Sequence, residues 1–213
     1  EESRGKDMGH TFVNLKTVQI TADTVALDAD GISVAAAVGN NAALVIGGAL
    51  ASGGAVALSH GRIVTILSAG NDAAKSFTVT GTDINGDAQT ESITGANAGT
   101  ATGSKYFLTI SGISAVGNPA GNVSAGVNGS AADVITVSAA KLKGVSYTST
   151  ATAGLLDFLT TSPSGTSVMK LGSVASATAT RDVTIPEEGA SFSSGIYLQY
   201  TVSTFLTMTV HHA

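Results

Sequence analysis

Apolar and polar residues alternate along much of this chain with the two-residue period of β-strands. The alternation is loose over residues 11–25 and clearest near the C-terminus, over residues 196–202 and 205–210. Only Ser203 and Thr204 separate the last two runs, so the pattern predicts that they form a hairpin.

Glycine- and asparagine-rich turns interrupt the alternation at regular intervals. Asn85 and Gly86 lie between two alternating runs, and this dipeptide tolerates the positive φ angles of a type I′ turn, so a hairpin is predicted over residues 77–93. Helical periodicity is weak, and the one candidate, residues 32–38, is short enough to be at most a surface turn. Further turn clusters occur at residues 69–72, 95–99, 117–121 and 128–130.

This spacing predicts an all-β chain made of two small antiparallel β-sandwich domains, immunoglobulin-like or jelly-roll-like, with Gly/Asn-rich turns. A new apolar pattern begins at Lys141, which places the boundary between the domains near residues 128–142. We therefore expect an N-terminal arm or first strands in residues 1–30. A β-sandwich domain should occupy residues 31–135 and a second, smaller one residues 136–213.

The composition limits the classes of partner. The 213 residues carry a net charge of −5, and only 12% are charged. An acidic chain has no electrostatic footprint for nucleic acid or for an anionic membrane surface, so neither partner is expected. A surface of small polar side chains with few charges suits a protein packed beside other copies. The absence of cysteine excludes disulfides and thiol catalysis.

Residues 42–58 form an uncharged run that approaches the length of a membrane span. The run contains two glycine pairs, Gly47-Gly48 and Gly53-Gly54, and lacks flanking aromatic or basic anchors. We therefore interpret it as turns between short apolar strands rather than as a transmembrane segment.

Four oxygen-bearing side chains near the predicted hairpin could ligate a hard cation such as Ca²⁺. They are Asp83, Asn85, Asp87 and Glu91. A calcium loop needs a longer loop with a carboxylate at its twelfth position, whereas these acids flank a short turn and alternate onto strand faces. A solvated hairpin tip is the favoured interpretation, and we expect neither a metal nor another cofactor.

The histidines and acids do not form a recognisable catalytic pattern. His211 and His212 are adjacent, so a strand directs them to opposite faces, and His10 and His60 are isolated in the sequence. No nucleophile-elbow, zinc-protease or phosphate-loop motif is present, so we expect surface histidines and no enzymatic activity. Glu187 and Glu188 are neighbours on a turn, which does not supply the cleft-spanning acids of a glycosidase.

The few aromatic residues could form either a binding platform or part of a core. Tyr106 and Phe107 are adjacent, and Tyr200 shares the core-facing parity of Ile196 and Leu198. Tyr197 has the opposite parity. Because tyrosine is enriched at interfaces, Tyr197 is the candidate for contact with a partner.

A succession of short motifs covers residues 61–114, beginning with an Arg-x-Val-Thr-Ile strand and ending with a lysine-aromatic strand. Between them lie residues 68–72, residues 77–83, the Asn-Gly hairpin and residues 95–100. This succession resembles a module of structural proteins of tailed bacteriophages. The C-terminal part also resembles a small sandwich of phage virion proteins, through Leu-x-Gly-Val at residues 142–145 and an Ile-Pro-x-x-Gly turn at residues 185–189, before a Gly-Ile-Tyr-Leu strand.

The resemblance implies a location on the phage particle, and it supplies no catalytic residues. It implies a multicopy capsid decoration or cement protein whose partners are the major capsid protein or other virion proteins, together with further copies of itself. A tail or head-fibre component is the alternative within the particle. A cell-surface adhesion or glycan-binding β-sandwich module is the alternative from another class.

Overall fold

The computed structural model describes residues 14–173, 178–186 and 188–213, and these residues form fifteen β-strands and no helix. Every strand pairing is antiparallel. The predicted all-β antiparallel fold is therefore confirmed. The strands are β1 (Lys16–Thr21), β2 (Asp28–Ala37), β3 (Ala51–Ser52), β4 (Ala55–Ser68), β5 (Ser76–Thr82), β6 (Ala88–Thr94), β7 (Thr100–Val116), β8 (Asn122–Thr136), β9 (Ala140–Ser149), β10 (Gly154–Thr160), β11 (Thr166–Ser173), β12 (Ala179–Thr184), β13 (Ala190–Phe192), β14 (Ile196–Thr201) and β15 (Phe205–His212).

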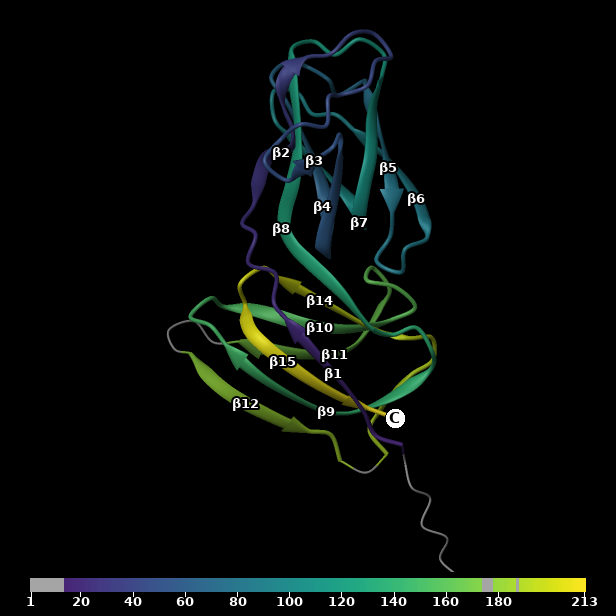
Figure 1. Cartoon of the computed structure of the whole chain (residues 1–213), viewed down its shortest axis with the longest axis vertical. Coiled ribbons are helices and arrows are strands. Elements are labelled where there is room, and N and C mark those ends of the chain that lie inside the picture. Colours follow the sequence, from purple (N-terminus) through teal and green to yellow (C-terminus); the bar gives the residue numbers. More distant parts are fainter. Residues whose placement is uncertain (1–13, 174–177, 187) are drawn as a thin grey trace, which may run out of the picture.

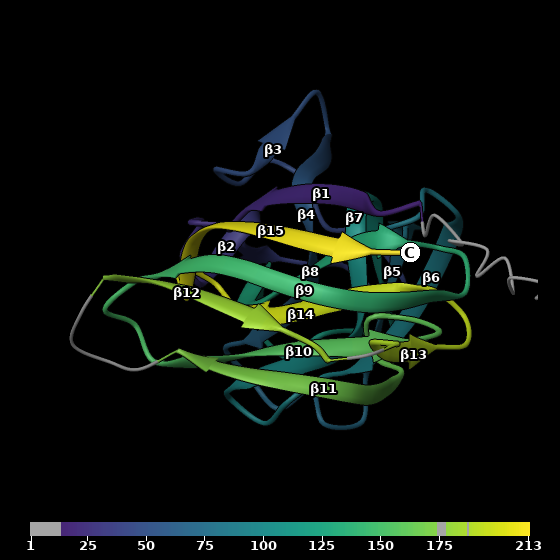
Figure 2. The same ribbon diagram turned by 90° about the horizontal axis from the view of Figure 1, so that it is seen from below.

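The strands form two sheets. The smaller has the order β1-β15-β9-β12, with β13 also paired to β9. The larger has the order β11-β10-β14-β8-β4-β7-β5-β6, with β2 paired to β8 and β3 paired to β4. The smaller sheet packs face to face against β10, β11 and β14, which gives a two-layer sandwich (Figure 2).

The described residues bury two hydrophobic cores, and each defines a lobe of the molecule (Figure 1). The first lobe contains β2–β7 and the first part of β8. Its core is mostly aliphatic and includes Ile66 and Ile110. The second lobe contains β1, the end of β8 and β9–β15. Its core is richer in rings, such as Phe158 and Phe205.

Strand β8 belongs to both lobes. Val123 and Val127 lie in the first core, whereas Ala131 and Ile135 lie in the second. The chain thus changes lobe at residues 128–130, inside a strand and at the start of the predicted boundary region of residues 128–142. β1 pairs with β15 in the second lobe, so both ends of the described chain build that lobe.

The predicted hairpin between the last two strands is wrong. β14 pairs with β10 and β8 in the larger sheet, whereas β15 pairs with β1 and β9 in the smaller one. The turn between them, with Ser203 at φ 61°, crosses from one layer of the sandwich to the other. The register also shifts between Phe205 and Met208, so both of these residues are buried although simple alternation placed them on opposite faces.

Two local predictions around the first lobe differ in their outcome. The hairpin over residues 77–93 is confirmed by β5 and β6, but the turn is not type I′, because Gly86 has a positive φ of 88° and Asn85 does not. Bonds from Asp83 N to Asp87 O (2.8 Å) and from Gly86 N to Asp83 O (3.1 Å) define a three-residue loop that ends in a glycine bulge. The surface turn predicted over residues 32–38 is wrong, since β2 covers most of this range.

The uncharged run over residues 42–58 contains the β3–β4 hairpin, as the glycine pairs predicted. Gly53 and Gly54 form its turn with φ angles of 61° and 81°, and the hairpin projects from the rest of the molecule (Figure 2). Within the described residues, no helix has the length and apolar character needed to cross a membrane.

Candidate functional site

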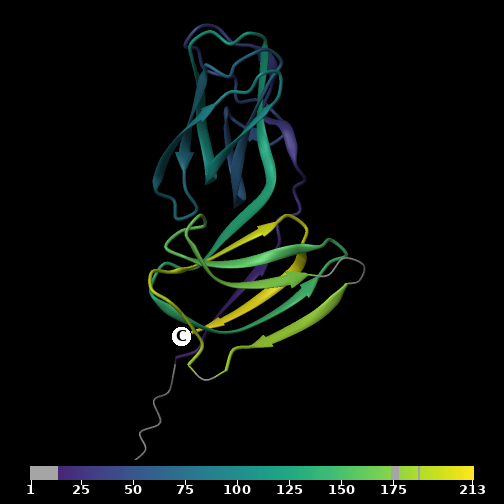
Figure 3. The same cartoon turned by 180° about the vertical axis from the view of Figure 1, so that it is seen from behind.

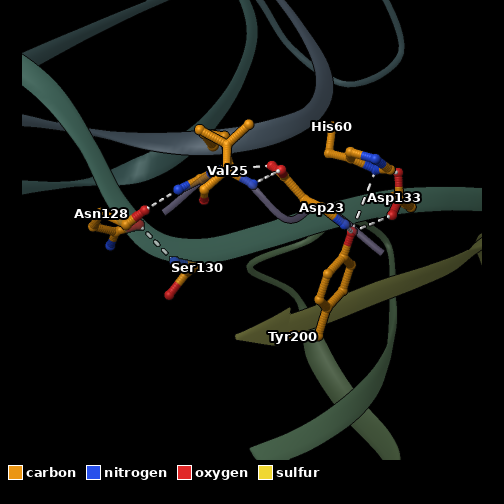
Figure 4. A network of polar contacts seen from close by, with 8 residues as sticks. Asp23, Val25, His60, Asn128, Ser130, Asp133 and Tyr200 are labelled. Atoms are coloured by element: carbon orange, nitrogen blue, oxygen red, sulfur yellow. Dashed lines mark hydrogen bonds and ion pairs between the residues drawn. The ribbon is translucent and has the colours of Figure 1, made fainter. Parts of the chain in front are cut away.

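A network of buried polar side chains lies where the two lobes meet (Figure 4). Its members come from the segment after β1, from β4, β8 and β14, so the tertiary structure collects residues that are far apart in the sequence. The network has two parts, one around Arg62 and one around His60.

Arg62 is the centre of the first part and is fully buried, at 0% exposure. Its Nη1 donates to Asp23 Oδ2 at 2.7 Å and to the Val25 carbonyl at 3.0 Å, and its Nη2 donates to the Asn128 carbonyl. Asn128 is the point at which β8 passes between the lobes. Through its two terminal nitrogens the buried guanidinium ties the segment after β1 to the bend of β8, while its Nε has no hydrogen-bond partner within the described residues.

Asp23 connects the two parts of the network. Its Oδ1 accepts the Val25 N–H at 2.8 Å, and its own backbone N–H donates to Tyr200 Oη at 3.0 Å. Its carbonyl accepts the Ser203 N–H at 2.9 Å, just before β15. Arg62, Tyr200 and Ser203 therefore all hold the segment that leads from β1 toward β2.

The second part joins His60, Asp133 and Tyr200. His60 Nδ1 lies 2.8 Å from Asp133 Oδ1, and because a carboxylate only accepts, the ring nitrogen is the donor. The Tyr200 hydroxyl donates to Asp133 Oδ2 at 3.0 Å and lies 3.3 Å from His60 Nδ1. The rings of His60 and Tyr200 meet edge to face, with centroids 6.4 Å apart.

These contacts set the ionisation of the network. The hydrogen bond to Asp133 raises the pKa of His60 above its ordinary value of 6.5. Burial, together with the nearby charge of Asp133, raises the pKa of the Tyr200 hydroxyl far above 10, which keeps it a neutral donor. The His60–Asp133 pair resembles the base and orienting acid of a hydrolase, but the third member is a neutral phenol rather than an activated nucleophile. The arrangement is suited to holding the lobes together.

Further contacts join the lobes beside this network. Gln199 Nε2 donates to Tyr106 Oη at 2.6 Å, and Ser164 Oγ donates to the Ser104 carbonyl at 3.1 Å. Within the first lobe, Ile84 at the tip of the β5–β6 hairpin packs on Gly61. A side chain at Gly61 would place its Cβ 2.1 Å from the Ile84 Cγ2 atom.

A groove of about 320 Å³ lies between the β5–β6 hairpin tip and the β10–β11 turn. Its walls carry amides, hydroxyls, one acid and one base. We call it the inter-lobe groove. Among its lining residues are Asp83, Asn85, Gln89, Lys105, Ser162 and Ser164.

The structure does not assemble the four proposed cation ligands. Asp83 Oδ1 accepts the backbone N–H groups of Asn85 (2.8 Å) and Asp87 (3.0 Å), so this carboxylate stabilises the turn. Glu91 turns toward β7 and accepts the Ser104 N–H at 2.6 Å. Across the described residues, no group of three or more acidic, histidine or cysteine side chains could hold a metal ion.

The histidines fall in different environments. The surface position expected for His60 is wrong, since it belongs to the junction. His212 is only 4% exposed, and burial lowers its pKa. His211 Nδ1 lies 3.2 Å from Thr17 Oγ1, and His10 lies outside the described residues. Adjacent strand positions separate His211 from His212, as predicted.

The other singled-out residues also have defined places. Glu187 lies outside the described residues, and Glu188 forms an exposed ion pair with Lys141. The exposed position that strand parity predicted for Tyr197 is wrong, since Tyr197 is only 5% exposed. Tyr197 and Gln199 lie on the same face of β14, and Gln199 contacts Tyr106 of the first lobe. The first lobe therefore lies over this face of β14, which would be exposed if the second lobe stood alone.

The buried charges are not among the residues that the sequence pattern singled out as candidate sites. Arg62 belongs to the Arg-x-Val-Thr-Ile strand motif, and an arginine between apolar strand residues is a signal of a buried, paired charge. Asp72 is also fully buried. Its Oδ1 accepts the Ala120 N–H at 2.7 Å, while its Oδ2 has no hydrogen-bond partner within the described residues.

Comparisons with known proteins leave the chain without an assigned family. No family model matches it, and searches of the curated proteins and of the solved structures found no match.

Proposed function

We propose that this chain is a structural protein of a tailed-phage particle, present in many copies as a decoration or cement protein on the capsid surface. Its partners would be the major capsid protein or other virion proteins, and neighbouring copies of itself. The proposal rests on the resemblance of residues 61–114 and of the C-terminal part to phage structural proteins, and on the character of the described surface.

One observation carries the proposal most strongly: apolar side chains are exposed on both lobes of a surface that bears few charges. Arg62, Asp23 and Asp133 are engaged inside the junction, which reduces the charge left outside. Surfaces of this kind suit close packing of many copies, in which weak contacts add up. The exposed large apolar residues include Val45, Val116, Leu155 and Leu206.

The junction is consistent with the same proposal, because it holds the two lobes together. A strand shared by both cores, a buried ion pair and the His60–Asp133–Tyr200 contacts all resist bending at this point.

Sedimentation of decorated heads tests the proposal. Purified protein is mixed with heads that lack it, the heads are pelleted, and copies per head are counted. We expect saturation at hundreds of copies, steep dependence on protein concentration and weak dependence on salt, because few charges are available to be screened. Heads that already carry the protein are the control and should bind no more.

Saturation at a few copies, or labelling confined to the tail or to one vertex, would contradict decoration and favour a tail or head-fibre component. The inter-lobe groove favours a second candidate, a glycan-binding adhesion module, because amides and hydroxyls such as Asn85 and Ser162 hydrogen-bond sugar hydroxyls. A glycan-array screen tests that candidate. Glycan affinity without head binding would replace the decoration proposal.

A further inference from the structure

The outer edge of β2 leaves strand backbone unpaired, although the register of β2 on β8 shifts between Ser33 and Ala36. β2 pairs with β8 on one side and lies at the outside of the first lobe (Figures 1 and 3). On its other side, the carbonyls of Gly31 and Ile32 accept N–H groups from Leu50 and from Gly47 and Gly48. Beyond Ile32, no described residue forms a backbone hydrogen bond with that side of β2.

The unpaired part of β2 is also exposed on its faces. Residues 34–37 are all exposed, and Val34 retains 55% of its accessible surface. Val45, in the loop that returns to β2, is 79% exposed. Exposed apolar side chains beside a free strand edge are the usual features of a surface that pairs with another strand.

Charges on edge strands normally prevent such pairing, and residues 31–37 of β2 carry none. Each outer strand of more than three residues has at least one: Lys16 in β1, Glu91 in β6, Lys170 in β11, and Arg181 and Asp182 in β12. The remaining edges, β3 and β13, are only two and three residues long. β2 has acids at Asp28 and Asp30, but residues 31–61 contain no Asp, Glu, Lys or Arg.

We propose that residues 33–37 of β2 pair antiparallel with the same residues of a second copy of this chain. Two copies can approach along this edge without charge repulsion, even though the whole chain carries a net charge of −5. An antiparallel strand paired with itself is self-complementary about a two-fold axis, so the contact closes as a dimer and joins two ten-stranded sheets. A charged partner would find no opposite charge on this edge, which favours a second copy.

A charge placed on the edge tests the proposal. Sedimentation velocity of the wild-type chain should show a dimer at about 100 µM, and Ala35→Lys should raise the dimer Kd at least about tenfold. Ala74→Lys is the matched control, because Ala74 is exposed in a turn of the same lobe, and it should leave the Kd unchanged. A wild-type chain that stays monomeric at this concentration would overturn the proposal.

Cross-linking provides a readout that does not depend on a disruptive charge. The chain has no cysteine, so single substitutions at residues 34–37 introduce a unique thiol. Disulfide-linked dimer should peak at one of these four positions and be absent for Ala74→Cys, because facing strand residues approach within disulfide range. A dimer that Ala35→Lys leaves intact and that none of these cysteines captures would use another surface, and the proposal would be wrong.

This self-association is independent of the proposed function. A monomer that decorates heads would overturn the β2 contact alone, whereas a dimer through β2 that does not bind heads would overturn decoration alone.

Discussion

The two lobes fill their interiors with different side chains. Phe77 and Phe107 are the only rings among the buried residues of the first core, and the rest of it is Ile, Val, Leu and Ala. The second core contains five aromatic residues, and two of them, Tyr200 and Phe205, meet edge to face with ring centroids 4.9 Å apart. A chain with few aromatic residues thus concentrates them in the lobe that contains both ends of the described chain.

The difference has a consequence for buried polar groups. In the second lobe, tyrosine combines a ring in the core with a hydroxyl at its rim: Tyr200 Oη reaches Asp133, and Tyr147 Oη donates to the Gly172 carbonyl at 2.9 Å. The first lobe buries Asp72 and Ser68, which have short side chains, and Asp72 Oδ2 and Ser68 Oγ have no partner within the described residues. Because the tyrosine side chain is long and amphipathic, Tyr200 lets the second core extend into the junction.

Loss of the buried ion pair should have the largest effect. Arg62→Met leaves Asp23 as an uncompensated buried charge, and we expect the free energy of unfolding to fall by about 3–5 kcal/mol. Urea denaturation measures this loss. The double variant Asp23→Leu/Arg62→Met should recover most of it, because no charge then remains buried. A double variant as unstable as Arg62→Met would show that the pair does not act through its charges.

The tyrosine hydroxyls should come next. Tyr200→Phe leaves the buried Asp23 N–H without its acceptor, and we expect a loss of about 1–3 kcal/mol in the free energy of unfolding. Tyr147→Phe is the matched variant. Its partner, the Gly172 carbonyl, belongs to an exposed residue of the outer strand β11 and can bond to water, so the loss should be smaller. Equal losses in urea denaturation would contradict the special role of Tyr200.

Small cavities should affect both lobes alike. Ile66 and Ile196 are fully buried, one in each core, so Ile66→Val and Ile196→Val should each cost about 0.5–1.5 kcal/mol. Because β8 runs through both cores, we expect a single calorimetric transition that both variants lower. Two transitions, each moved by only one variant, would show that the lobes unfold separately.

Two histidines should give the smallest effects, with opposite signs. The pKa of His60 is raised in the folded state, so its contribution to stability is full below about pH 6.5 and is lost as the pH rises through the folded-state value. Burial lowers the pKa of His212, so its contribution is full above about pH 6.5 and is lost as the pH falls. The melting temperature should be measured from pH 5 to pH 9. Its decline toward alkaline pH should be absent in His60→Gln, and its decline toward acidic pH should be absent in His212→Gln. A decline unchanged in its variant would contradict that assignment.

Local features of the sequence were sufficient for part of the fold. Alternation over a few residues and the flanking turn residues predicted the hairpin at residues 77–93 and the projecting glycine turn at Gly53 and Gly54. The same reasoning explained why Asp83 and Asp87 belong to a hairpin tip, since their contacts lie within four residues of each other.

Strand partners and burial were decided only by the tertiary structure. β14 and β15 are consecutive but belong to different sheets, and periodicity does not specify which sheet a strand joins. His60 and Tyr197 were predicted at the surface because alternation describes one sheet at a time. In the structure, each of them faces the other lobe. Arg62 and Asp23 are 39 positions apart, so no local pattern in the sequence indicates that their charges meet. The sequence alone determined the all-β class and the hairpins at residues 77–93 and at Gly53-Gly54, because the interactions that form these hairpins are local. The junction depends on packing between distant segments, so only the tertiary structure decided it.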